Sequence, residues 1–216
     1  MPRFNTCKCN GMTYEAAATI EPTGIALCPT KIAGVCGEDI VAVLGDGPIG
    51  LYMTQTAKAY GARQVILIGS RDERLAVGRQ LGADQTVRYR DANVVQQIRD
   101  ATGGHGVDVA LEAVGKPSVW PIIAGIIAPR GRVMMTGLFA GKTCDVLFDP
   151  LVVNNVTIHG TVGAPNCWAE CISLHERGRI NAAPIVTHRL PLADFEKGIE
   201  MSCNGTDGTI KVMLLP

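Results

Sequence analysis

The stretch VAVLGDGPIGL, residues 41–51, places an apolar run directly before three glycines with the spacing G-x-G-x-x-G. The first glycine allows a tight turn, the second leaves room for a phosphate beside the backbone, and the third lets a helix pack close to the strand. In this strand–turn–helix context the motif binds the pyrophosphate of a dinucleotide at the helix N-terminus. We therefore predict a dinucleotide-binding turn. The residues assigned to it are Gly45, Gly47, Pro48, Ile49 and Gly50.

Outward from this turn, short apolar runs alternate with helical patterns as far as about residue 163. Continuous apolar strands separated by helices are typical of βαβ units, whose right-handed crossovers build a sheet covered on both faces. We predict an α/β fold: a Rossmann doubly wound parallel six-stranded sheet with helices on both faces. The predicted strands are 39–45, 64–69, 85–89, 107–115, 131–137 and 155–163.

The composition limits the size, the partners and the cellular location expected of the protein. The chain has 216 residues, enough for one well-buried α/β domain. It carries 20 basic and 20 acidic residues, so its charge gives no reason to expect nucleic acid or a membrane as partner. No apolar run is long enough to span a bilayer and no signal-peptide core is present, so we expect a cytoplasmic protein. Most of its eight cysteines are expected to be small buried hydrophobes rather than disulfide partners.

The choice of dinucleotide depends on the end of the second predicted strand. NAD-specific folds have an acidic residue there, about 20 positions after the turn, which binds the ribose hydroxyls. Here the position holds Gly69, so the carboxylate that would repel a 2′-phosphate is missing, and arginines follow that can pair with phosphate. We predict NADP, although Asp72 or Glu73 would favour NAD if either reached the ribose. The residues assigned to this specificity are Gly69, Ser70, Arg71, Arg74 and, at the end of the neighbouring strand, Tyr89.

Seven stretches, in this order and spacing, resemble the cofactor half of the medium-chain zinc-containing alcohol dehydrogenases, especially their sorbitol-like polyol branch. They are YEAAATIEPTGIAL, VAVLGDGPIGL, RLAVGRQLGAD, GVDVALEAVG, GRVMMTGLFAG, PIVTHRLPL and IKVMLLP. The Gly-Ser-Arg sequence with its distant Tyr is similar to that of NADP-dependent secondary alcohol dehydrogenases of the same family. A separate catalytic domain begins the chain in this family, so we expect this chain to hold the cofactor-binding part only.

The resemblance implies three regions and an assembly. Residues 1–38 would be the remnant of the catalytic domain with linker helices, residues 39–186 the NAD(P)-binding Rossmann domain, and residues 187–216 a C-terminal strand–helix–strand return segment. Family dimers pair the last strands of their sheets edge to edge. We therefore expect a homodimer through the 156–162 edge strand, which has no Pro or Lys to guard it.

The resemblance also implies further contacts with the cofactor. Ala113 and Val114 would lie near the adenine, Gly137 and Leu138 near the nicotinamide, and Lys211 would reach the pyrophosphate. It places no catalytic residue on this chain.

The metal of the family has one matching ligand. Glu21, in the dipeptide Glu-Pro, matches a carboxylate of the catalytic zinc shell and would bind metal only in a full-length enzyme. A catalytic zinc needs three protein ligands. Cys7 and Cys9 have no His nearby, and Cys167 and His175 would lie about 12 Å apart along one helix. We expect no zinc to be held by this chain alone.

The leading hypothesis is an NADP(H)-binding domain of an oxidoreductase that, at full length, transfers hydride between a secondary alcohol or ketone and nicotinamide. Two alternatives remain. One is a truncated, non-catalytic dinucleotide-binding or sensor module, and the other is a zinc-free enzyme similar to quinone reductases.

Overall fold

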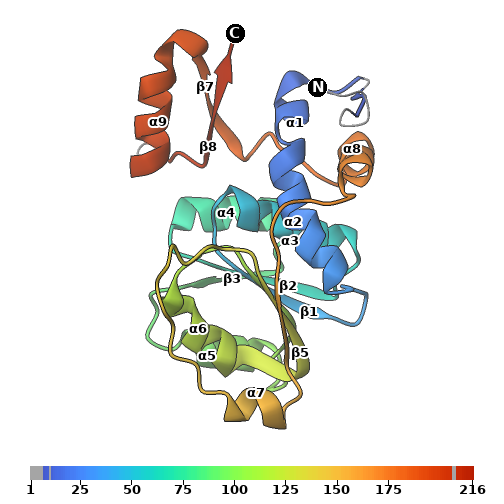
Figure 1. The fold of residues 1–216 in the computed structure, drawn as a ribbon, viewed down its shortest axis with the longest axis vertical. Coiled ribbons are helices and arrows are strands. Elements are labelled where there is room, and N and C mark those ends of the chain that lie inside the picture. The colour runs from blue at the N-terminus through green and yellow to red at the C-terminus, as the bar shows by residue number, and fades with distance from the viewer. Residues whose placement is uncertain (1–6, 10, 206–207) are drawn as a thin grey trace.

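The computed structural model describes residues 7–9, 11–205 and 208–216. Its centre is a parallel six-stranded sheet with the order β3-β2-β1-β4-β5-β6 (Figure 1). This order confirms the predicted doubly wound sheet and the position of β3 beside β2. The strands are β1 (Ile40–Leu44), β2 (Gln64–Gly69), β3 (Gln85–Arg88), β4 (Val107–Glu112), β5 (Ile127–Met135) and β6 (Thr157–Gly160).

Helices cover both faces of this sheet (Figure 1). The helices are α3 (Pro48–Ala59) and α4 (Asp72–Gln80) on one face, and α5 (Val94–Ala101) and α6 (Trp120–Ile126) on the other. Alternate residues of β1 enter different cores: Val41 and Val43 pack with α3, whereas Ala42 and Leu44 pack with α5 and α6. All five residues of β1 are buried, which is why the strand is a continuous apolar run.

The predicted start of β5 is wrong. We predicted that β5 begins at residue 131, but it begins at Ile127, because α6 ends at Ile126 and the chain pairs with β4 across an irregularity. Arg130 has a φ of 62°, so the turn-like residues before 131 are a distortion inside the strand. Between β5 and β6 the chain forms the short helix α7 (Asp149–Val153), whose Leu151 is buried.

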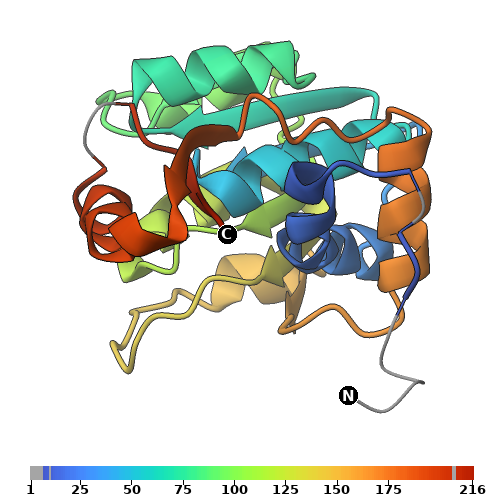
Figure 2. The same ribbon diagram turned by 90° about the horizontal axis from the view of Figure 1, so that it is seen from above.

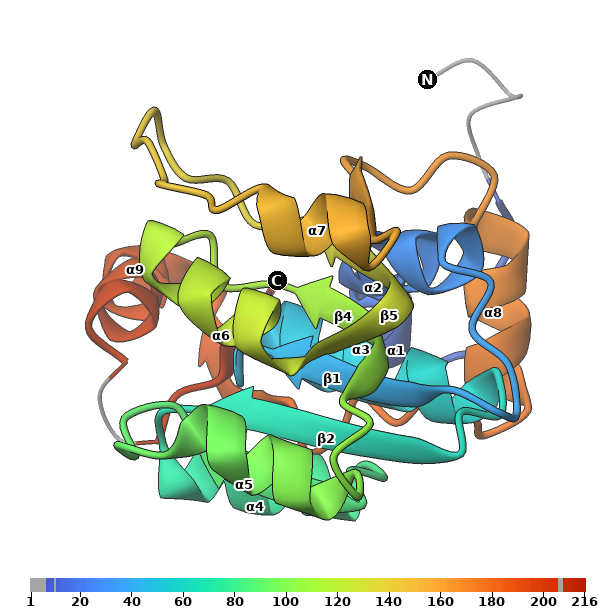
Figure 3. The same cartoon turned by 90° about the horizontal axis from the view of Figure 1, so that it is seen from below.

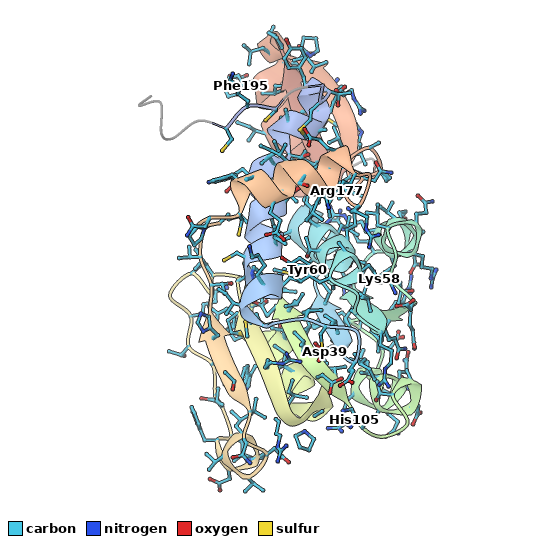
Figure 4. The ribbon with its side chains drawn as sticks, turned by 90° about the vertical axis from the view of Figure 1, so that its right-hand side faces the viewer. Asp39, Lys58, Tyr60, His105, Arg177 and Phe195 are labelled. Atoms are coloured by element: carbon cyan, nitrogen blue, oxygen red, sulfur yellow. The ribbon has the colours of Figure 1, made fainter. Side chains whose placement is uncertain are left out.

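The N-terminal and C-terminal segments flank the sheet. Helices α1 (Tyr14–Ala18), α2 (Ile20–Ile32) and α8 (Trp168–Glu176) lie on one side of the molecule (Figure 2). On the other side, β7 (Val186–Pro191), α9 (Phe195–Asn204) and β8 (Lys211–Leu215) form a small unit with its own two-stranded sheet. Figure 4 shows Phe195 of this unit at the end of the molecule opposite His105, which precedes β4.

The described residues also show how many cysteines are buried and whether any helix could cross a membrane. Of the eight free cysteines only three are buried, so the expectation that most are buried hydrophobes is wrong. Within the described ranges, no helix is both long and apolar enough to cross a membrane.

Candidate dinucleotide site

The glycine turn lies where β1 ends between β2 and β4. The Gly45 N–H donates to the Ile68 carbonyl at 2.8 Å, and the Ala113 N–H donates to the Leu44 carbonyl at 2.9 Å. Gly45 has a φ of 119°, which a residue with a side chain rarely adopts. A Cβ on Gly50 would lie 1.8 Å from the Gly45 carbonyl oxygen, so α3 can pack this close only through a glycine.

The second glycine of the turn has a different role. Gly47 is the N-cap of α3, and a Cβ built there would have no neighbouring atom within 4 Å. Pro48 and Ile49 follow as the first helical residues, so the free N–H groups at the start of α3 adjoin this open space. Space beside a helix N-terminus is what a pyrophosphate requires.

A cavity of about 210 Å³ adjoins the turn at the carboxyl edge of the sheet. This is less than the roughly 300 Å³ at which sites for a whole drug-sized ligand begin, and it suits one end of a dinucleotide. Apolar side chains and a polar rim both contribute to its lining. The lining residues are Leu44, Gly45, Asp46, Ile68, Gly69, Ser70, Tyr89, Arg90, Val114, Lys116, Ser118 and Val119.

Asp46 explains why the second strand ends in glycine. Its carboxylate Oδ2 accepts hydrogen bonds from the backbone N–H groups of Ser70 at 2.7 Å and Arg71 at 2.8 Å. A Cβ on Gly69 would lie 2.6 Å from the Cβ of Asp46, so the side chain of Asp46 occupies the space that a side chain at residue 69 would need. Asp46 was not among the residues predicted from the sequence, although an acid between two glycines of the motif was the available signal.

The structure separates the residues assigned to cofactor specificity. Ser70 and Tyr89 line the cavity, and the Tyr89 hydroxyl donates to the Ser118 carbonyl at 3.3 Å. Arg71 and Arg74 do not line the cavity. The Arg71 Nη1 donates to the Gly205 carbonyl at 2.8 Å, and the Arg74 guanidinium donates to a carbonyl of the same C-terminal unit.

Glu112, which was also not predicted from the sequence, organises the turns after β4 and β5. It is fully buried, and its carboxylate accepts hydrogen bonds from the N–H groups of Val114 and Gly115, both at 2.7 Å, and of Gly137 at 3.0 Å. These bonds bring Val114 and Gly137 to the same edge as the glycine turn. A carboxylate inside the apolar run VALEAVG was the available signal.

Replacing Glu112 by Gln tests this arrangement, because the amide keeps the volume but turns an NH₂ group toward backbone donors. We expect the free energy of unfolding to fall by about 1–3 kcal/mol, the cost of leaving buried donors without an acceptor. Urea denaturation followed by circular dichroism measures the change. The exposed Glu176→Gln is the matched control, and an equal effect of the two substitutions would contradict the role of Glu112.

The remaining predicted contacts lie apart from the cavity. Ala113 is half-buried beside the turn, and its carbonyl would lie 3.2 Å from a Cβ on Gly45. Leu138, which follows Gly137, is 79% exposed. Lys211 begins β8, paired with Val186, and does not line the cavity.

The described residues do not fit a catalytic zinc. Glu21 lies in the first turn of α2 and lines a cavity of about 460 Å³ with Cys7 and Cys9. Even so, within the part of the chain that the structure describes, no group of three His, Cys, Asp or Glu side chains is placed to hold a metal ion. Burial raises the pKa of the Cys171 thiol to about 12, which disfavours the thiolate that binds metal. We therefore assign no step of zinc chemistry to these residues.

The sheet order and the glycine turn define a class of protein: a doubly wound dinucleotide-binding domain. Residues 48–177 match the family model described as zinc-binding dehydrogenase. This match covers more than half of the chain, and the chain belongs to that family.

Curated relatives agree with the resemblance found in the sequence. The erythritol/L-threitol dehydrogenase of Mycolicibacterium smegmatis is 33% identical over 205 residues, which are 94% of this chain and 56% of that protein. The L-threonine 3-dehydrogenase of Bacillus licheniformis is 33% identical over 208 residues, which are 95% of this chain and 59% of that protein. The chain thus spans a little over half the length of these relatives.

Solved structures are similar in fold. The 2R,3R-butanediol dehydrogenase of Bacillus subtilis has a TM-score of 0.88 and 28% identity, with 96% of this chain and 59% of that chain covered. A short chain alcohol dehydrogenase from E. coli CFT073, solved with NADH, has a TM-score of 0.91, with all of this chain and 64% of that chain covered. At 24% identity the second likeness shows the fold alone.

Proposed function

We propose that this chain is the NADP(H)-binding part of an enzyme that transfers hydride between a secondary alcohol or ketone and nicotinamide. The observation that carries the proposal is the open space at Gly47, beside the first turn of α3 and next to the cavity at the ends of β1 and β2. When bound, the nicotinamide ring accepts or supplies the hydride. The residues of this chain bind and orient the cofactor: the turn holds the pyrophosphate, Ala113 and Val114 adjoin the adenine, and Gly137 adjoins the nicotinamide.

The preference for NADP over NAD rests on the end of β2. Residue 69, the last of β2, carries no carboxylate, and Ser70 offers an exposed hydroxyl beside it. Arg71 and Arg74 would add positive charge by turning from the C-terminal unit toward a 2′-phosphate. Lys211 would reach the pyrophosphate in the same way, by movement of β8.

Titration with NADPH and NADH, followed by fluorescence of the reduced nicotinamide, tests this preference. We expect NADPH to bind at least about tenfold more tightly, since hydrogen bonds to a charged group contribute about 1.5–3 kcal/mol. Arg71→Ala should lower the affinity for NADPH and leave the affinity for NADH unchanged. Arg79→Ala, which removes an exposed arginine from the same helix α4, is the control. Tighter binding of NADH, or no loss in Arg71→Ala, would contradict the assignment.

The proposed assembly is a homodimer through the 156–162 edge strand. All four residues of β6 are exposed, and the strand is the last of the sheet, so its outer backbone groups are available for pairing. The apolar side chains of Val152 and Val153 are 70% and 77% exposed on α7, the helix that precedes β6 along the chain and is drawn in gold in Figure 3. An edge of this kind favours pairing with a second copy.

The proposed domain boundaries and cellular location are supported by the positions of the strands and by the state of the cysteines. The division at residues 38 and 186 is supported by the start of the large sheet at Ile40 and the start of β7 at Val186. A cytoplasmic setting is supported by the free thiols of all eight cysteines, which persist in a reducing compartment.

A further inference from the structure

Arg90 is not among the residues assigned to cofactor specificity from the sequence. It follows Tyr89, whose N–H donates to the Gly69 carbonyl at 2.7 Å and so continues the β2–β3 pairing beyond Arg88. Residue 90 therefore emerges at the carboxyl edge next to the end of β2. Its side chain lines the same cavity as Gly69 and Ser70.

The charges around this cavity leave Arg90 available for an anion. Arg90 and Lys116 are the two cations of the lining, and among the described residues neither side chain has a hydrogen-bond or ion-pair partner. The one acid of the lining, Asp46, is 7% exposed and already accepts two backbone N–H groups. Burial lowers the pKa of the Arg74 guanidinium and Asp46 opposes this shift, so Arg74 offsets part of the Asp46 charge.

Arg71, which was assigned to cofactor specificity from the sequence, is less well placed than Arg90 to bind an anion in the cavity. The Arg71 guanidinium donates to the Gly205 carbonyl and packs so closely that a Cβ on Gly205 would lie 2.3 Å from its Nη1. Arg71 must break this contact before it can reach a ligand in the cavity, whereas Arg90 breaks none.

We propose that Arg90 is a further residue, in addition to Arg71, that recognises the 2′-phosphate of the cofactor, a proposal that rests on the proposed preference for NADP. In a doubly wound fold the adenosine ribose lies at the end of the second strand. Arg90 follows β3, which adjoins β2 (Figure 1), whereas Lys116 follows β4, which is separated from β2 by β1. A planar guanidinium at the nearer position pairs with a phosphate through two N–H groups.

Lys116 provides a matched control, because it places the same charge on the far side of the same cavity. The probes are adenosine 2′,5′-bisphosphate and adenosine 5′-monophosphate, titrated by calorimetry into the full chain and into its Arg90→Ala and Lys116→Ala variants. The two probes differ only in the 2′-phosphate. Both side chains are exposed, and thermal melts followed by circular dichroism check that each variant is folded.

In Arg90→Ala we expect the affinity for the bisphosphate to fall at least about tenfold, while the affinity for the monophosphate stays within about threefold. Lys116→Ala should change both affinities by the same factor, and Arg90→Lys should retain part of the preference. A folded Arg90→Ala chain that keeps its full preference for the bisphosphate overturns the role of Arg90, as does a selective loss in Lys116→Ala alone. Equal binding of both probes by the unaltered chain instead contradicts the preference for NADP itself.

Discussion

Gly50→Ala is expected to lower the free energy of unfolding by about 3 kcal/mol or more, at or above the upper end of what an overpacked site usually costs. The added Cβ would lie 1.8 Å from the Gly45 carbonyl oxygen and 2.8 Å from its carbonyl carbon. Both are backbone atoms of the turn, so relief requires the helix α3 to move away from β1. Urea denaturation measures the loss, and NADPH titration is expected to show that binding is lost with the turn.

Gly47→Ala separates the two roles of glycine in this turn. Its φ of −78° suits alanine and its surroundings are open, so stability should change by no more than about 1 kcal/mol, the cost of alanine at an N-cap. The methyl group nevertheless projects into the space assigned to the pyrophosphate. We expect the affinity for NADPH to fall at least about tenfold, equivalent to 1.4 kcal/mol. Unchanged affinity in Gly47→Ala, or unchanged stability in Gly50→Ala, would contradict this account of the turn.

Gly69→Asp introduces the acid that NAD-specific folds have at this position. We expect this substitution to destabilise the protein without improving the binding of NADH. The new Cβ would lie 2.6 Å from the Cβ and 2.7 Å from Oδ2 of Asp46. Two carboxylates cannot share this half-enclosed space, so the free energy of unfolding should fall by about 3–5 kcal/mol through overpacking and an uncompensated charge. NADH affinity should not improve, although the substitution follows the NAD pattern.

The compensating change is Asp46→Gly, which removes both the carboxylate and the Cβ. In the double variant Asp46→Gly/Gly69→Asp we expect much of the lost stability to return and the preference to move from NADPH toward NADH. Gly69→Ala is the control, since it introduces the clash without the charge. A double-mutant cycle between residues 46 and 69 measures the coupling. Additive effects of the two substitutions would contradict a shared space.

Most of the fold could be predicted from local patterns in the chain. The apolar run QVILIG is β2 with the predicted bounds, and the glycine turn lies between a buried strand and a helix as expected. Such patterns work because a parallel strand buried on both faces must be apolar along its whole length. The boundary of β5 was missed, because pairing with β4 carries the strand through turn-like residues that are local signals for a break.

The site was only partly predictable. Gly45, Ser70 and Tyr89 line the cavity, as the motif and the sheet order suggested. Asp46 and Arg90 also line it and were not assigned, because their roles depend on which side chain fills the space above the end of β2.

The sequence by itself determined the family, the order of strands and the position of a glycine turn at the mouth of a helix, since each depends on neighbouring residues or on a pattern of apolar runs. Only the tertiary structure decided which charges face the cavity. Arg71 is bound to a carbonyl 134 residues away, whereas Asp46 faces Ser70 across the ends of two strands. The direction of a long charged side chain is set by such distant partners, because several rotamers are open to it until the chain around it has packed.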